Sequence, residues 1–339
     1  MDKEFLYDEL LDDELLPEEL FTSAVAQIRA KENTLLSDQA LENLMNCNTA
    51  EECIFYLLER GWGPTEHNTP EELLKAEKDK CWATIRSLCN EQQMHYFDIF
   101  RYNRDYHNLK VAIKESYIQK PVKDVYMEDG TIPIEQLRKC AADNDFSSLS
   151  ASMMRCAQEA RNVLFQTGDS QLCDVIIDKA ALAAIYKAGK DTGNDLLREY
   201  GELKCGAADI NIALRACRAK KDTDFLERAF VECDSISVPR LVAAARNGID
   251  SIYEYLELTS YADAVPEIKK GSAAFDKWCD DRMMKLIRPQ KYNAFTISPL
   301  AAYVLAKENE IKSVRMILSG KVNDLPEAKI RERLRESYV

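Results

Sequence analysis

One short stretch of the sequence carries part of the pattern of a phosphate-binding loop. Gly189, Lys190, Asp191 and Thr192 follow one another, as glycine and lysine do at the end of such a loop. The full pattern also needs a glycine where Ala184 stands and a serine or threonine where Asp191 stands. Because the backbone cannot wrap a phosphate without these residues, we do not expect a nucleotide site here.

Two adjacent carboxylates, Asp280 and Asp281, stand in a stretch with helical periodicity. Aspartates on a helix bind metal ions in helical prenyl-transfer enzymes, since carboxylate oxygens are the ligands that magnesium prefers. The second half of that pattern is missing, because Met284 takes the place of the next acid. We therefore interpret the pair as part of a solvated helix face.

Histidine is too scarce to build a nucleophile–base set or a zinc site. The chain has three histidines, His67, His95 and His107. His95 and His107 stand twelve residues apart in an aromatic-rich tract, which predicts packing in a core or between domains. The aromatic residues of this tract are Tyr96, Phe97, Phe100, Tyr102 and Tyr106.

The 11 cysteines form neither a disulfide framework nor a metal motif. Their number is odd, and no two of them form a C-x-x-C pair. We interpret them as small buried hydrophobic residues in a reducing compartment. They stand at positions 47, 53, 81, 89, 140, 156, 173, 205, 217, 233 and 279. The sequence thus assigns no catalytic, cofactor-binding or metal-ligating residue.

The elements around these residues are predicted to be helices. Glycine and proline are scarce, at 11 and 10 of 339 residues, and the best helix formers are abundant. A chain of this length is expected to form two or three domains. Its net charge of −13 excludes a generally basic surface for nucleic acid and disfavours direct adsorption to anionic lipid.

The sequence offers no segment that would carry the chain into or across a membrane. The first residues, Met1 to Glu4, are acidic and lack the apolar core of a signal peptide. No run of 18 uncharged apolar residues occurs. We expect a cytosolic protein, or one bound to a partner from the cytosolic side.

Helix ends can be placed at both ends of the chain. Two short amphipathic helices within 40–58 are predicted to meet just before Thr49, which is a candidate N-cap with Glu52 three residues later. A long helix is predicted over 299–318, because a proline stands in its first turn and Gly320 just past its end. A last helix is predicted to open at Pro326 and to carry Ile330 and Leu334.

Three markers recur in the same order at intervals near 100 residues. The dipeptide Asp-Lys begins at positions 79, 178 and 276. An apolar helical stretch follows each one, around Asn108, Asn211 and Glu310. A leucine with a large apolar residue 12 positions later precedes each one, as Leu44 with Tyr56, Leu137 with Leu149, and Leu241 with Tyr253. The repeat predicts three helical domains, 1–118 with an acidic N-terminal extension, 119–222 and 223–339.

The repeated polar residues have a structural interpretation. An Asn or Asp near the start of a helix caps it, so a repeated one would cap equivalent helices. We favour this interpretation of the Asp-Lys pairs, Asn108 and Asn211 over direct contact with a partner. The aliphatic residues around them are expected in the core, namely Leu109, Ile212 and Ile311.

With the repeat in view, several stretches resemble one protein family. The first has Arg29, Glu32 and a leucine pair at the family's spacing. The others are 106–110, 209–215 and, as the most specific part, 299–321 with 330–334. Over about residues 20–339 the chain resembles the central-stalk socket subunit of V-type and A-type rotary ATPases. Its bacterial and archaeal form is designated C, and its eukaryotic form is designated d.

The resemblance implies a fold, a role and a set of partners. The fold would be a pseudo-threefold funnel of three similar helical domains. The protein would sit on the cytoplasmic face of the membrane rotor ring, receive the foot of the central shaft built from D- and F-type subunits, and transmit torque. Protons or sodium ions would cross at the ring, and the socket itself would be non-catalytic, without a cofactor and without a transmembrane segment.

Two departures from the family pattern and one alternative stay open. Asp209 stands two residues before Asn211, whereas the family tends to have three, as between Asp105 and Asn108. Residues 1–16, rich in Asp and Glu, have no family counterpart. The alternative is a stand-alone helical adaptor or scaffold unrelated to ion transport, and an enzyme is the least favoured interpretation.

Overall fold

The described part of the chain is mostly helical. A computed structural model describes residues 21–63, 69–122 and 124–339, so residues 1–16 and His67 lie outside the described residues. Every regular element in these ranges is a helix, which confirms the predicted all-α fold. No helix in the described ranges has the length and apolar character needed to cross a bilayer.

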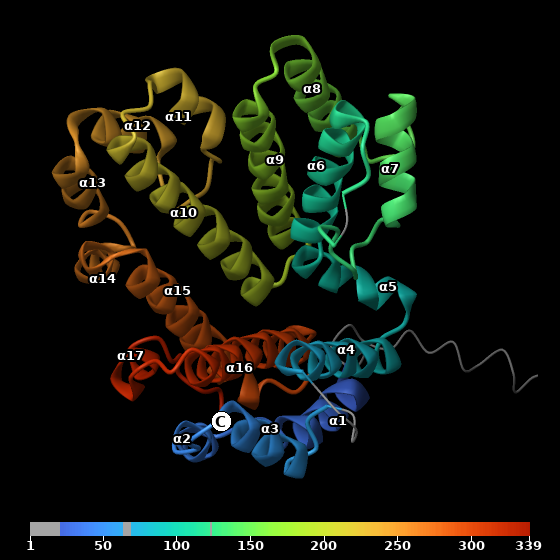
Figure 1. Ribbon diagram of the computed structural model, residues 1–339, viewed down its shortest axis with the longest axis vertical. Coiled ribbons are helices and arrows are strands. Elements are labelled where there is room, and N and C mark those ends of the chain that lie inside the picture. Colours follow the sequence, from blue (N-terminus) through green and yellow to red (C-terminus); the bar gives the residue numbers. More distant parts are fainter. Residues whose placement is uncertain (1–20, 64–68, 123) are drawn as a thin grey trace, which may run out of the picture. The chain divides into compact units, whose positions relative to one another are not determined.

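Contacts between residues divide the chain into two compact units (Figure 1). The first unit joins the residues up to Gln92 with Asp280–Val339, and the second is the continuous stretch Gln93–Cys279. The boundaries pass through two helices, α5 (Glu91–Met94) and α15 (Ser272–Ile287).

The first unit is assembled from both ends of the sequence. Its other helices are α1 (Thr22–Glu32), α2 (Asp38–Met45), α3 (Ala50–Glu59), α4 (Pro70–Leu88), η3 (Arg288–Tyr292), α16 (Ser298–Val322) and α17 (Glu327–Arg331). One apolar core runs through it, made by residues such as Leu44, Leu57 and Leu73 together with Val314 and Ile317. Helices α2, α3, α4 and α16 therefore share one apolar core.

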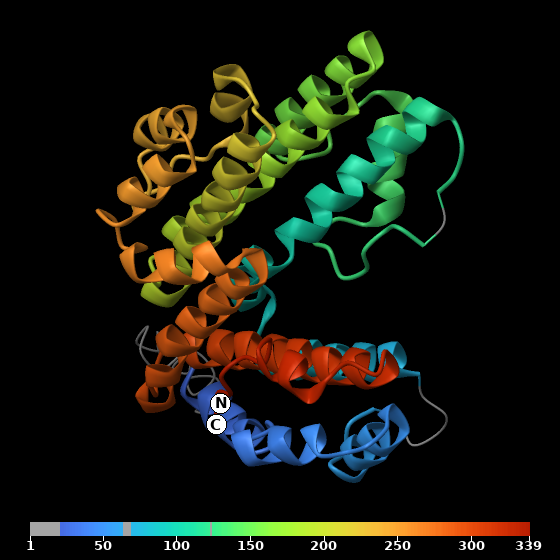
Figure 2. The ribbon, with the colours of Figure 1, turned by 60° about the vertical axis from the view of Figure 1, so that its left-hand side comes forward.

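The second unit is continuous in sequence (Figure 2). Its elements are η1 (His95–Phe100), α6 (Tyr102–Ile118), α7 (Ile134–Asp143), α8 (Ala151–Thr167), α9 (Ser170–Asp191), α10 (Asp195–Arg218), α11 (Thr223–Ala229), α12 (Val238–Asn247), α13 (Ile249–Leu256), η2 (Ala262–Ala264) and α14 (Val265–Lys270). Helices α8 and α10 both pack against α9. An apolar core under α6 to α9 contains Leu109, Leu137, Ala157 and Ile177.

The sequence markers fall on a repeated series of helices. The leucines Leu44, Leu137 and Leu241 are fully buried in α2, α7 and α12. The Asp-Lys pairs lie in α4, α9 and α15, and the stretches around Asn108, Asn211 and Glu310 lie in α6, α10 and α16. The boundaries expected near 118 and 222 fall at the end of α6 and just before α11. The three-domain funnel itself stays a prediction.

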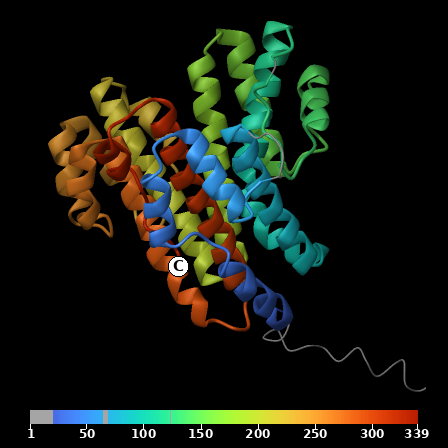
Figure 3. The ribbon, with the colours of Figure 1, turned by 60° about the horizontal axis from the view of Figure 1, so that its bottom comes forward.

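The long helix that closes each predicted repeat packs against the helices of the next one. Helix α6 packs on α7 and α9, and α10 packs on α12 and α13. Helix α16 packs on α2, α3 and α4 from the first part of the chain (Figure 3). Each of these three helices thus contacts helices that the sequence assigned to a different repeat.

The predicted helix ends are partly confirmed. Thr49 caps α3, since its hydroxyl oxygen accepts the Glu52 N–H at 3.2 Å. Gly320 was expected past the end of a helix, but α16 continues to Val322. Gly320 serves packing instead of ending the helix, because a Cβ at this position would lie 2.4 Å from the Cδ1 atom of Ile330 in α17. This glycine thus lets α17 approach α16 closely.

Candidate functional site

The stretch that carries part of a phosphate-loop pattern is helical. Gly189 and Lys190 lie in the last turn of α9. A Cβ on Gly189 would lie 2.6 Å from the carbonyl oxygen of Leu197 in α10, so the glycine allows these two helices to touch through their backbones. The Lys190 ammonium binds Asp234 at 3.0 Å. These residues serve packing and surface pairing.

We predict that Gly189→Ala destabilises the chain. The added methyl forces α9 and α10 apart, and the cost of overpacking exceeds the gain in helix propensity by about 1 to 2 kcal/mol. Chemical denaturation followed by circular dichroism would measure the difference. Lys187→Ala, at an exposed position of the same helix, is the control and should change the stability by about 0.5 kcal/mol or less. An unchanged midpoint for Gly189→Ala would contradict the packing role.

The acidic pair in α15 is not a solvated helix face. Asp280 accepts hydrogen bonds from Lys312 at 2.8 Å and from Arg335 at 2.9 Å, and Asp281 accepts the N–H of Glu336 at 2.9 Å. Burial opposes the ionisation of Asp280, but the two cations outweigh it and hold its pKa below the usual value. The pair joins α15 to α16 and to the segment that follows α17.

The two described histidines, His95 and His107, do not form a catalytic set. His95 Nδ1 lies 3.0 Å from the Asp98 carboxylate on an exposed surface, and His107 Nε2 lies 2.8 Å from the Val125 carbonyl oxygen. The predicted aromatic packing is confirmed for its central residues, since Phe97, Phe100 and Tyr106 are buried. In the part of the chain that the structure describes, no three His, Cys, Asp or Glu side chains gather as metal ligands would.

All of the cysteines are free thiols. The predicted burial is confirmed for Cys53, Cys81, Cys140, Cys156, Cys173 and Cys205, whereas the others are half-buried. Burial raises the pKa of Cys53 to about 12 and that of Cys89 to about 11. Such thiols stay protonated at neutral pH and are poor nucleophiles.

The repeated polar residues do not cap helices. Asn108 lies in the middle of α6, where its side-chain amide donates to the Met127 carbonyl oxygen and accepts the Met127 N–H, both at 2.8 Å. Asn211 and the Asp-Lys pairs lie inside helices too. The capping interpretation is therefore wrong. The role of Asn108 is to hold the segment around Met127 along α6, which local sequence could not reveal.

Two buried carboxylates stand at matching places in α6 and α10. Asp105 accepts the Ile132 N–H at 3.1 Å, and Asp209 accepts the Val231 N–H at 3.2 Å. Both side chains are almost fully shielded from water. Burial raises the pKa of both, and that of Asp209 reaches about 7. Each carboxylate therefore ties the chain that follows its helix back onto that helix.

The first unit also contains a buried cluster of charged side chains, which joins α16 to α4. The Lys307 ammonium, on α16, binds Glu310 at 2.6 Å and Glu77 of α4 at 3.1 Å. It also lies 4.9 Å from the ring centre of Trp62. The other oxygen of Glu310 accepts the Leu36 N–H at 2.6 Å. Burial alone would lower the pKa of Lys307, but the two carboxylates outweigh it and raise the pKa.

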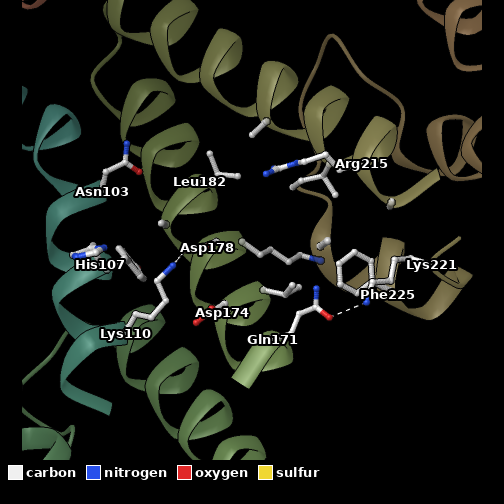
Figure 4. Close-up of a pocket in the computed structure, with 18 of the residues that line it drawn as sticks. Asn103, His107, Lys110, Gln171, Asp174, Asp178, Leu182, Arg215, Lys221 and Phe225 are labelled. Atoms are coloured by element: carbon white, nitrogen blue, oxygen red, sulfur yellow. Dashed lines mark hydrogen bonds and ion pairs between the residues drawn. The ribbon is translucent and has the colours of Figure 1, made fainter. Parts of the chain in front are cut away.

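The best candidate for a binding site is a groove on the second unit (Figure 4). It has a volume of about 610 Å³ and runs over α9 between α6 and α10, with α11 at one end. We call it the α9 groove. Its walls and floor include the apolar residues Ala181, Leu182, Ala208, Ile212, Ala216 and Phe225.

The α9 groove is positively charged although the chain is acidic. Its lining contains the cations Lys110, Lys179, Arg215 and Lys221 and the anions Asp174 and Asp178, a net charge of +2. One pair neutralises itself, because Lys110 binds Asp178 at 2.6 Å. The groove can therefore take up an acidic ligand by charge attraction.

Among the residues that the structure describes, three of these cations are hydrogen-bonded to uncharged oxygen atoms only. Lys179 donates to the Glu227 carbonyl oxygen at 2.9 Å, Lys221 to the side-chain oxygen of Gln171 at 2.8 Å, and Arg215 to the carbonyl oxygen of its own helix at 3.2 Å. In chemical terms the groove is suited to bind carboxylates next to apolar side chains. The Asp-Lys repeat includes Asp178, which lines the groove. The repeat predicted a helix cap, however, and not a groove.

Comparison with known proteins covers almost the whole chain. The model of the family described as ATP synthase (C/AC39) subunit matches residues 24–333. The C subunit of the V-type sodium ATPase of Enterococcus hirae is 22% identical over 319 residues, which cover 92% of this chain and 97% of that protein. The C subunit of the A-type ATP synthase of Methanocaldococcus jannaschii is also 22% identical, over 91% of this chain and 84% of that protein.

Proposed function

The chain belongs to the ATP synthase (C/AC39) subunit family, and from that premise we propose that it couples the central shaft of a rotary ATPase to the membrane rotor ring. The observation that supports this role is the extent of the match, residues 24–333, which includes both compact units. In the proposed role the chain transmits torque between ATP chemistry in the catalytic head and the movement of protons or sodium ions at the ring. It does no chemistry of its own.

The structure of the helices suits a part that transmits torque. Helices α9, α10 and α16 have 22, 24 and 25 residues, so each is a rod of about 33 to 38 Å. Glycines bring α9 and α10 into backbone contact, since a Cβ on Gly201 would lie 3.1 Å from the Ile185 carbonyl oxygen. Close contact of this kind leaves little room for helices to slide under load.

The partners in this proposal are the D- and F-type shaft subunits and the rotor ring, on the cytoplasmic face of the membrane. The net charge of −13 opposes docking on anionic lipid, so attachment has to come from protein surfaces. Each of these contacts should bury on the order of 1,000 Å² or more to persist under torque.

Loss of coupling is the test of this proposal. Membranes carrying the complex without this chain should keep ATP hydrolysis by the catalytic head and lose ATP-driven ion transport, and adding the purified chain back should restore transport. Intact ion transport without the chain would refute the role. Binding to rotor rings should require the shaft subunits and survive replacement of anionic lipid by neutral lipid. Purification of the chain with no other part of an ATPase would favour the stand-alone adaptor.

A further inference from the structure

A small internal cavity lies in the first unit beside α16, and we call it the α16 cavity. Its volume is about 10 Å³, which is close to the smallest that holds one water molecule. Its wall includes the apolar residues Leu36, Leu41 and Ala306, and Ser337 and Tyr338 of the C-terminal segment. Every residue that lines it is buried, so a ligand in this cavity is enclosed by the fold.

Two polar groups of α16 line this cavity without a hydrogen-bonding partner. The side-chain oxygen of Asn309 and the hydroxyl of Ser313 are shielded from water, and neither is hydrogen-bonded within the described part of the chain. The two residues are 5% and 1% exposed and stand four positions apart, on one face of the helix. A buried polar group of this kind is costly unless a partner satisfies it.

The hydrogen bonds around the cavity determine which ligand fits. The side-chain nitrogen of Asn309 donates to the Glu336 carbonyl oxygen at 2.9 Å, which leaves the side-chain oxygen as an acceptor. The Ser337 hydroxyl donates to the Val339 carbonyl oxygen at 2.6 Å, whereas the hydroxyl hydrogen of Ser313 is available. The ligand must therefore donate to Asn309 and accept from Ser313.

Charge and size narrow the choice of ligand further. The carboxylate of Glu310 also lines the cavity, and the Lys307 ammonium binds that carboxylate at 2.6 Å. The ammonium repels a second cation, and the carboxylate repels an anion. The volume leaves no room for an organic molecule. A neutral ligand of this size that both donates and accepts hydrogen bonds is water.

We propose that the α16 cavity binds one water molecule as a permanent part of the fold. The water accepts the hydrogen of the Ser313 hydroxyl and donates to the side-chain oxygen of Asn309 and to the Glu310 carboxylate. Each Glu310 oxygen binds one protein donor, and a carboxylate oxygen accepts two. Three hydrogen bonds are typical of a buried water. The inference does not depend on the rotary role, since it concerns the isolated chain.

A high-resolution crystal structure of the full chain tests the site directly. We expect one water at about 2.7 to 3.2 Å from Asn309 Oδ1, from Ser313 Oγ and from a carboxylate oxygen of Glu310. A cavity without density, with the Ser313 hydroxyl turned to a carbonyl oxygen of its own helix, would overturn the proposal. A peak at about 2.3 to 2.6 Å from several oxygen atoms would also overturn it, because such distances indicate a metal ion.

A matched pair of variants gives a second readout in solution. Magnetic relaxation dispersion of the water oxygen counts the water molecules that stay inside a protein. Ser313→Val removes the hydroxyl and puts a methyl group into the cavity, so we expect one long-lived water fewer than in the wild type. Ser319→Val changes an exposed position of the same helix and should leave the number unaltered. Equal numbers in all three proteins would contradict the water site.

The same two variants should differ in stability. Ser313→Val leaves the buried oxygen of Asn309 without a partner, so the equilibrium constant of unfolding should rise about tenfold. Ser319→Val should raise it about twofold, through the lower helix propensity of valine. Equal changes in the two variants would mean that Ser313 satisfies no buried group, and the proposal would then fail.

Discussion

Replacing Lys307 with methionine is expected to lower the free energy of unfolding by about 3 to 5 kcal/mol. Lys307 is 3% exposed and is the cation between two buried carboxylates, Glu77 and Glu310. Methionine fills a similar volume but leaves those carboxylates buried without their counter-charge. The loss therefore reports the cost of two unpaired buried anions rather than a loss of packing.

The control for this prediction is Lys80→Met. Lys80 also lies near Glu77, with its ammonium 3.5 Å from the carboxylate, but its side chain is 62% exposed. The charge change is the same, and the expected loss is about 1 kcal/mol or less because water replaces the ammonium. Urea unfolding followed by tryptophan fluorescence measures both variants, since Trp62 lies against Lys307. Equal losses in the two variants would contradict the buried-charge explanation.

The Lys307→Met deficit should also depend on pH. Burial raises the pKa of Glu310, and removing Lys307 takes away the largest interaction that opposes this rise. A carboxyl with a raised pKa in the folded state loses its stabilising contribution as the pH rises through that pKa. The deficit should therefore be smaller at pH 5.5 than at pH 8. Adding Glu77→Gln and Glu310→Gln should recover much of the lost stability at either pH.

Asp209→Asn should change how the stability of the chain depends on pH. The folded state holds the proton of Asp209 with a pKa of about 7, whereas an unfolded aspartate has a pKa of about 3.9. Stability from the protonated form is fully present below about pH 4 and is lost as the pH rises to about 7. Between pH 5.5 and pH 8 the wild type should thus lose about 2 kcal/mol that the Asn variant keeps.

The measurement is the difference in unfolding free energy between variant and wild type at these two pH values. Asparagine has nearly the same size, and its side-chain oxygen can still accept the Val231 N–H that Asp209 binds. Asp224→Asn, at an exposed position of α11, is the matched control and should give the same difference at both pH values. If the difference for Asp209→Asn is also constant, then Asp209 is ionised throughout and the proposed cause is wrong.

The sequence predicted the features that depend on local chemistry. The all-α fold follows from the scarcity of glycine and proline, and the start of α3 follows from the hydroxyl of Thr49 and the glutamate three residues later. The family was also recognisable, because the run 299–321 keeps both residue type and spacing over one long helix. Each of these signals lies within a single segment, so it can be recognised from this sequence alone.

The wrong predictions all concern residues whose roles are set by contacts with another segment of the chain. Gly320 has the pattern of a helix end, but its role is to make room for Ile330. Asp280 has the pattern of a solvated acid, but it binds Arg335, 55 residues away. Asn108 has the pattern of a cap, but it holds Met127. Local sequence gives a residue's propensity, and each of these roles depends on which other segment packs against it.

The groove could not be predicted from the sequence for the same reason. Its cations come from α6, α9, α10 and the turn before α11. Nothing in the spacing of Lys110, Lys179, Arg215 and Lys221 indicates that they share one surface. Their proximity exists only once the helices have packed.

The placement of α16 has a consequence for synthesis on the ribosome. Glu77 is paired with Lys307, 230 residues later, and the apolar residues of α2 to α4 share their core with α16. At a translation rate of about 5 to 20 residues per second, Lys307 of α16 is synthesised roughly 10 to 50 s after Glu77 of α4. The continuous second unit can complete its own core during that interval. Nascent chains should therefore bind chaperones through residues 36–74 until α16 has left the exit tunnel.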